Sequence, residues 1–399
     1  MKSFAFAFAF ALMTMTLACA PLQQKTTPKR EEQKRNHDSM GSFISEWQLR
    51  ANEELRLPLP ESYRYDFYVD WGDGTEIAHV DAHDDPDATH VYQQTGKYTV
   101  RISGLLEAWS FWRLPQSSDN LLRVVDLGAV GWKSFFGAFS ICRNLSLVRG
   151  GDVADVVNMS SMFDGSQAVK VVGDDWDTGN VEDMSYMFAG ARVANPQVQS
   201  WDTRSVKDMS YMFANTYEAN PDVSAWNTSN VEDMGGMFFY ADKAQPDTSA
   251  WNTVSVKNMA NMFMHAKLAN PDTSCWHTTA VENMSNMFNS APAAQPDVSC
   301  WDVRNVKSMD YMFRQTGAMK LEVSDWDLHS IGSMIGMFAE AGMPADTYSV
   351  LLQRLAETSV QADVRLDAGD SKYHHRASAA RETLLANGWL INDAGVAGE

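Results

Sequence analysis

Four residues in the first quarter of the chain have side chains that could hold a metal ion. His79, Asp81, His83 and Asp85 alternate along a short acidic segment. Imidazole nitrogens and carboxylate oxygens are ligands that proteins offer to Zn²⁺ and Ca²⁺. Their spacing matches no established ligand motif. A metal site here is therefore a hypothesis, and an exposed acidic loop is its alternative.

Motifs that would indicate catalysis are missing from the sequence. It contains no Gly-x-Ser-x-Gly, no His-Glu-x-x-His, no glycine-rich phosphate loop and no Cys-x-x-Cys pair. These arrangements supply an activated nucleophile, a zinc-bound water, a phosphate cradle or a redox dithiol. We predict that the chain is not an enzyme and that it uses no cofactor.

Much of the chain repeats with a period of 25 residues and without insertions. Each unit has an aliphatic residue, a methionine three residues later and a Met-Phe pair three residues after that. The pairs are Met162-Phe163, Met187-Phe188, Met212-Phe213, Met237-Phe238, Met262-Phe263, Met287-Phe288, Met312-Phe313 and Met337-Phe338. A tryptophan recurs with the same period from Trp176 to Trp326. Such columns are typical of stacked repeats, in which each unit buries its apolar face against its neighbours.

A unit of 25 residues is too short for two helices and a loop. The Val-x-x-Met-x-x-Met-Phe segment suits a strand that leads into one helical turn, and Asn195–Trp201 alternates as a short strand does. We therefore predict a mainly β chain with short helices, in which residues 151–343 form a leucine-rich-repeat-like parallel solenoid of eight repeats. Its strands would stack at about 4.8 Å, with the methionine and aromatic columns in the core.

Two cysteines occupy equivalent positions of neighbouring repeats. Cys275 and Cys300 each precede a repeat tryptophan and lie one period apart. Equivalent residues of stacked parallel strands are about 4.8 Å apart, within the Cα–Cα range of a disulfide. We predict a bridge between them, which an exported protein could keep.

The N-terminus has the pattern of a secretory signal peptide over residues 1–18, because a basic residue precedes an apolar stretch and a boundary of small residues. The segment Thr16–Cys19 resembles a bacterial lipobox, although threonine stands where leucine is usual. The resemblance implies a lipid on Cys19, a polar tether over residues 19–41 and attachment to a bacterial cell envelope with display at its surface. The alternative is cleavage after Ala20 and secretion of a soluble protein.

A small β domain is predicted over residues 42–104. Alternating apolar residues mark strands at Tyr65–Trp71 and Tyr98–Ile102. A WGDGT turn follows the first of these strands, and the sequence HVYQQTGKYTV leads into the second. The two motifs resemble the PKD-type domain, which implies an immunoglobulin-like β-sandwich ahead of the repeats.

The repeat unit, for example Trp201–Asn215, resembles the 25-residue repeat of BspA-like leucine-rich-repeat surface proteins of bacteria. That family also places a WGDG-containing β domain ahead of its repeats, so the resemblance covers about residues 43–395. It implies an exported, surface-displayed binding or adhesion protein without catalytic residues, and it names no ligand. Residues 105–150 and 344–399 are expected to cap the two ends of the repeats, because terminal units need a polar outer face.

The charge of the chain excludes one class of partner. Its 51 acidic and 32 basic residues give a formal net charge of −19, whereas binding to a phosphate backbone needs clustered lysine and arginine. We predict no nucleic acid partner. After the signal, no segment reaches the roughly 20 apolar residues of a membrane span, so the expected link to a membrane is the N-terminal lipid.

Ligand contacts are expected where residues vary between otherwise regular columns, around the turn after each Met-Phe pair. Six such residues are Arg192, Tyr217, Tyr240, Lys243, His265 and Lys267. The expected partner is a protein or a carbohydrate at a cell surface. Exposed aromatic rings such as Tyr217 and Tyr240 would suit a carbohydrate, and the wider acidic surface would suit a protein. A structural envelope lipoprotein without a specific ligand is the alternative.

Overall fold

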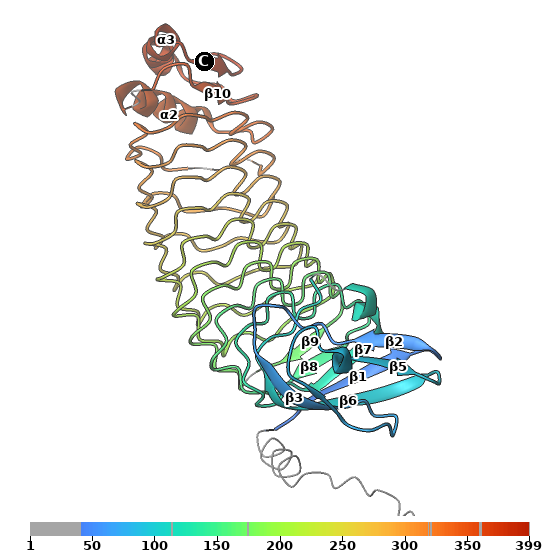
Figure 1. The fold of residues 1–399 in the computed structure, drawn as a ribbon. Coiled ribbons are helices and arrows are strands. Elements are labelled where there is room, and N and C mark those ends of the chain that lie inside the picture. Colours follow the sequence, from blue (N-terminus) through green and yellow to red (C-terminus); the bar gives the residue numbers. More distant parts are fainter. Residues whose placement is uncertain are drawn as a thin grey trace, which may run out of the picture.

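The structure, a computed structural model, describes residues 41–398 apart from 113, 114, 174, 318, 320, 359 and 360. Its helices and strands in chain order are β1 (Phe43–Leu49), β2 (Glu53–Arg56), β3 (Tyr65–Asp70), β4 (Ala78–Val80), the 3-10 helix η1 (Pro86–Ala88), β5 (Thr89–Tyr92), β6 (Gly96–Leu106), η2 (Pro115–Asn120), β7 (Leu121–Asp126), β8 (Leu147–Arg149), β9 (Lys170–Val172), α2 (Ala345–Thr358), β10 (Arg365–Asp367), η3 (His375–Ala377), α3 (Ser378–Ala386) and β11 (Leu390–Asn392). Figure 1 shows an elongated molecule with the N-terminal strands at one end, the stacked repeats in the middle and α2 and α3 at the other end.

The main sheet joins the N-terminal strands to the segments that lead into the repeats. Its seven strands have the order β4-β3-β6-β1-β7-β8-β9. β1 lies antiparallel to both of its neighbours, β6 and β7, whereas β7, β8 and β9 run parallel to one another. β2 and β5 form a separate antiparallel pair. One mixed sheet therefore begins in the N-terminal unit and ends at the start of the repeats.

The predicted fold class is corrected by this arrangement. The chain is mainly β with short helices, but its sheets are mixed, and the main sheet continues past residue 104 instead of closing a separate immunoglobulin- or PKD-like sandwich. The predicted parallel strands of a leucine-rich-repeat-like solenoid are also wrong. Between Gly173 and Pro344, the described residues form turns and single-residue bridges but no strand.

Successive repeats are joined through one polar position of each unit, which we call the bridge column. It contains Ser134, Asn158, Asp183, Asp208, Asp233, Asn258, Asn283, Ser308 and Ser333, each of which forms a parallel β-bridge with the next. Backbone N–H groups of the residues after each bridge position also donate to carbonyl groups of the next repeat. For example, the Met184 N–H donates to the Asp208 carbonyl (3.0 Å) and the Phe188 N–H to the Met212 carbonyl (2.9 Å).

Left-handed residues explain why these contacts do not lengthen into strands. In the repeat that follows Asp183, Tyr186 and Gly190 have φ angles of 55° and 67°. A positive φ turns the backbone out of the extended conformation. Tight turns form between the inter-repeat bonds, as where the Met187 N–H donates back to the Met184 carbonyl (3.3 Å). Each unit therefore forms a series of tight turns instead of an extended strand.

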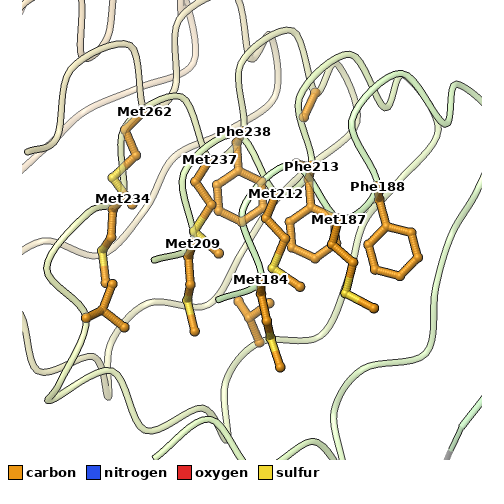
Figure 2. Packing of buried hydrophobic residues seen from close by; sticks show 14 of the residues in the cluster. Met184, Met187, Phe188, Met209, Met212, Phe213, Met234, Met237, Phe238 and Met262 are labelled. Atoms are coloured by element: carbon orange, nitrogen blue, oxygen red, sulfur yellow. The ribbon is translucent and has the colours of Figure 1, made fainter. Parts of the chain in front are cut away.

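The apolar columns form a continuous core, as the sequence predicts. Nine phenylalanine rings, one per unit from Phe139 to Phe338, stack with centroids 5.3–5.9 Å apart. Figure 2 shows the Met184, Met209 and Met234 side chains following one another beside this column. Their side chains are fully buried, so the apolar area of each unit is hidden only by its neighbours.

Buried threonines add polar contacts between neighbouring repeats. The Thr178 hydroxyl donates to the Asp202 carbonyl (3.0 Å) and the Thr203 hydroxyl to the Asn227 carbonyl (2.9 Å). Each bond satisfies a carbonyl of the next unit that no strand ladder satisfies. This threonine column was not among the columns predicted for the core.

The C-terminal segment closes the stack. β10 and β11 pair in parallel, and Leu366 of β10 bridges to Met334 of the last repeat. The Tyr348 side chain of α2 is buried, and its hydroxyl donates to Asp393 (2.9 Å). None of the helices in the described part of the chain has the length and apolar character needed to cross a bilayer.

Candidate functional site

The six predicted contact residues lie in three columns along one edge of the repeats. Arg192, Tyr217 and Lys267 share one column, Tyr240 and His265 share a second, and Lys243 belongs to a third. The structure brings several of them into contact across neighbouring repeats. The Tyr240 and His265 rings stack at 4.2 Å and 23°, and the Arg192 guanidinium lies over the Tyr217 ring, 5.9 Å from its centroid.

A continuous line of rings lies along this edge, and we call it the aromatic ridge: Tyr186, Tyr211, Phe239, Tyr240 and His265. Neighbouring centroids are 4.9 Å apart for the first pair, 6.1 Å for the second, 4.7 Å for the third and 4.2 Å for the last. The ridge crosses four repeats, which corresponds to about 15 Å along the stack. Three of its five members were not among the predicted contacts.

Four members of the ridge occupy backbone positions that bulky residues avoid. The φ angles of Tyr186, Tyr211, Tyr240 and His265 lie between 54° and 59°. Some equivalent positions carry residues that adopt this conformation more easily, such as Gly190, Asn215, Gly236, Asn261, Asn286 and Gly336, whereas others carry serine, glutamine, glutamate or, at position 311, tyrosine. A side chain with a Cβ pays a steric penalty there of roughly 1–2 kcal/mol. The aromatic residues are therefore not required by the turn itself.

Gly236 makes room for the centre of the ridge. A Cβ atom at this position would lie 2.3 Å from the Tyr211 ring, so only glycine lets that ring extend over the next repeat. The Tyr211 hydroxyl accepts a hydrogen bond from the side-chain amide of Asn261, which lies two repeats after Tyr211 (3.4 Å). The Tyr211 side chain is therefore positioned by the Tyr186 ring in the preceding repeat and by Asn261 two repeats later.

Ion pairs between neighbouring repeats border the ridge. The Lys267 ammonium lies 2.7 Å from the Asp242 carboxylate, and Lys243 pairs with Glu218. Each pair joins residues 25 positions apart. Exposed pairs of this kind add little stability, but they fix the charges that a partner would meet at the border.

The surroundings of His265 favour the neutral form of its imidazole. Burial lowers the pKa of its imidazole, the positive charges of Lys267 and Arg314 act in the same direction, and the Asp242 carboxylate opposes them. A neutral ring stacks on Tyr240 without placing a charge inside the ridge.

The four predicted metal ligands do not converge on one point. His79 contacts Asp66 (2.8 Å), and the Asp85 carboxylate accepts bonds from the Asp81 and Asp87 N–H groups (3.1 and 2.9 Å). Among the described residues, no group of three or more His, Cys, Asp or Glu side chains is placed to hold a metal ion. The metal hypothesis is corrected, because these side chains complete local turns and pairs. His83 instead lines a surface cavity described below.

The WGDGT turn has a structural role in the N-terminal unit. The His90 ring stacks on Trp71 (5.0 Å, 13°) and contacts the Asp73 carboxylate (2.8 Å). Burial raises the pKa of this carboxyl, but hydrogen bonds from Thr75 and His90 outweigh burial and lower the pKa to about 2. The turn is therefore fastened by a partly buried contact between the His90 ring and the Asp73 carboxylate.

The predicted disulfide is not present in the structure. Cys275 and Cys300 are exposed free thiols at equivalent positions of neighbouring repeats, and Cys142 is a buried free thiol. The bridge between Cys275 and Cys300 stays a prediction, and the predicted lipid site, Cys19, lies outside the described residues.

Comparison with known families identifies the repeats. The family described as "Mycoplasma protein of unknown function, DUF285" matches residues 133–251 and 239–349, more than half of the chain. The chain belongs to this family. The DUF285 matches contain the whole aromatic ridge, whereas β1 to β7 precede them. No curated protein and no solved structure matches the chain.

Proposed function

We propose that this DUF285 protein is a non-catalytic binding protein of a bacterial cell surface and that the aromatic ridge contacts a protein partner. One observation carries the proposal: Tyr186, Tyr211, Tyr240 and His265 place neighbouring aromatic rings at left-handed positions where most other repeats have glycine, asparagine or another non-aromatic residue. Residues that break a local backbone rule without stabilising the fold are concentrated at functional sites.

The packing of the rings favours a protein over a carbohydrate at the ridge. Tyr186 and Tyr211 stack face to face (interplanar angle 13°), as do Tyr240 and His265 (23°). Stacked rings offer their edges and hydroxyl groups, whereas a sugar ring needs an open aromatic face. Tyrosine edges bordered by fixed charges are typical of protein interfaces, in which tyrosine and arginine contribute most of the binding energy.

Display at the cell surface rests on the N-terminal signal. The lipobox-like segment that ends at Cys19 would anchor the chain, and the resemblance of the repeat unit to the repeats of BspA-like surface proteins supports display. Export without a lipid is the alternative, as is a structural envelope lipoprotein that has no specific ligand.

The test is a binding screen with a matched pair of variants. The purified protein would be immobilised and offered surface proteins of host and neighbouring cells, together with a glycan array. We expect saturable binding of a protein. The triple variant Tyr186→Asn, Tyr211→Asn and Tyr240→Asn should weaken that binding by at least about tenfold, because central tyrosines each contribute on the order of 1–2 kcal/mol.

The control carries the same substitution at an equivalent turn outside the ridge. Tyr311 has a φ of 55°, and Tyr311→Asn should bind as the unmodified protein does. No saturable binding to any probe would favour the structural envelope alternative. Equal binding by the triple variant would show that another surface contacts the partner.

A further inference from the structure

A cavity of about 460 Å³ opens where the N-terminal unit meets the first turns of the stack. Part of its lining comes from the end of β2 and the segment after it, at Arg56 and Leu59–Tyr63. The rest comes from His83, Ala108, Trp109, Ser110, Trp112, Ser134 and Phe136. Its volume is within the range of about 300–1,000 Å³ that is typical of small-molecule sites. The cavity lies far along the chain from the aromatic ridge and shares no residue with it.

The walls of the cavity are fixed by backbone hydrogen bonds. The Ser110 N–H donates to the Pro58 carbonyl (2.9 Å), and the Phe111 N–H donates to the Gly137 carbonyl (3.0 Å). Ala108 and Ser134 form the first bridge that leads into the bridge column. The site is therefore largely formed before a ligand arrives, which reduces the entropy lost on binding.

Two aromatic rings at the cavity are open to solvent. Trp112 is 50% exposed and Phe136 is 40% exposed, and their centroids are 5.6 Å apart with an interplanar angle of 50°. These tilted rings do not cover each other's faces as the stacked pair Tyr186 and Tyr211 does. Two large apolar side chains that remain this exposed beside a cavity indicate a binding site.

Polar side chains share the cavity with these rings. Arg56, Glu61 and His83 contribute to its lining, so donors, acceptors and both signs of charge are available. Trp109 also lines it, and its buried indole N–H has no hydrogen-bond partner among the described residues. A hydroxyl group that reached this N–H would supply the missing acceptor.

We propose that this cavity binds a pyranose ring of a glycan. One face of a pyranose carries C–H groups that pack on an aromatic face, and its edge carries hydroxyl groups that both donate and accept hydrogen bonds. The open faces of Trp112 and Phe136 match the first requirement, and the side chains of Arg56, Glu61 and His83 match the second.

The test uses the purified protein and the methyl glycosides of glucose, galactose, mannose, N-acetylglucosamine and N-acetylgalactosamine. Saturation-transfer NMR and tryptophan fluorescence would follow each titration. We expect saturable binding of at least one glycoside. Trp112→Ala and Phe136→Ala should each weaken it by about tenfold or more, whereas Trp112→Phe, which keeps an aromatic face, should weaken it less.

Two further variants make the result decisive. Arg56→Ala should also weaken binding, because it alters the polar wall without touching the rings, and Tyr311→Ala, at an exposed ring (38%) far from the cavity, should leave it unchanged. Melting temperatures would show that each variant is folded. Absence of saturable binding, equal binding by Trp112→Ala, or binding of a protein alone at this site would overturn the proposal. The triple ridge variant should bind the glycoside normally, so failure here and failure at the ridge are distinguishable.

Discussion

Three carboxylates follow one another in the bridge column, at Asp183, Asp208 and Asp233. The outer two receive amide donors, from Asn158 to Asp183 (3.2 Å) and from Asn258 to Asp233 (3.1 Å). The pKa of Asp208 is raised, chiefly by burial and further by the charges of Asp233 and Asp183, although hydrogen bonds from Ser210 oppose the shift. The middle carboxylate is therefore a local weakness of the stack.

Asp208→Asn is expected to stabilise the protein at neutral pH. An acid whose pKa is higher in the folded state binds its proton more tightly there, so its ionisation opposes folding above that pKa. Asparagine removes the charge and can keep the turn bond to the Ser210 N–H, as Asn258 does with Ala260 (3.0 Å). The melting temperature should rise by a few degrees at neutral pH, and the gain should shrink as the pH falls through the raised pKa of Asp208.

Asp222→Asn is the control for the melting temperatures measured at neutral and at lower pH. Hydrogen bonds from the Ser224 side chain and N–H lower the pKa of the exposed Asp222 carboxyl, so its charged form favours the folded state and its removal should not stabilise the protein. A stabilisation by Asp208→Asn that is independent of pH, or a loss of stability at neutral pH, would contradict the explanation.

At the scale of the single repeat, two left-handed residues in each unit explain both the turned backbone of the repeat and the position of the aromatic ridge. They curl the unit so that the Met and Phe side chains point into the core, and they turn the side chains at the left-handed positions toward the surface. Tyr186 is 42% exposed and Tyr311 is 38% exposed. The same backbone feature that prevents a strand thus presents a column of variable residues.

Tyr311→Asn is expected to stabilise the protein by up to about 1 kcal/mol, because asparagine tolerates a φ of 55° better than tyrosine does. Tyr186→Asn should be nearly neutral, since the gain is offset by loss of the Tyr186–Tyr211 stack, a contact of about 0.5–1.5 kcal/mol. Denaturant unfolding of both variants measures the difference. A large loss of stability for Tyr311→Asn would show that the turn requires the tyrosine.

The period, the buried columns and the edge that carries the variable residues were all predictable from sequence. Recurrence of Met, Phe and Trp every 25 residues is enough to identify a stacked core. The curled backbone was not predictable, because the left-handed positions carry tyrosine and histidine as well as glycine and asparagine, so no single residue type marks them. A mixture such as Tyr211, Gly236 and Asn261 in one column is the available signal. The contacts of Phe239 with Tyr211 and Tyr240 join residues of different columns, so the 25-residue period does not predict them.

At the scale of the whole molecule, Cys19→Ser tests how the protein is held. If Cys19 carries the lipid, the variant should lose incorporation of a labelled fatty acid and should leave the detergent phase on partitioning, whereas the unmodified protein should show both. Cys142→Ser, which changes a buried thiol, is the control and should keep the label. An unmodified protein without a lipid, whose mature N-terminus is Pro21, would instead support secretion.

The position of β1 determines how the protein responds to force. A pull from an N-terminal anchor enters the folded part next to Phe43, at the first residue of a strand that has β6 on one side and β7 on the other. Because both neighbours are antiparallel to β1, tension along this strand loads two rows of backbone hydrogen bonds together, in shear, instead of opening one row bond by bond. The N-terminal unit would then act as a mechanical clamp between the anchor and the repeats, because both rows of bonds must break together before the strand is extracted.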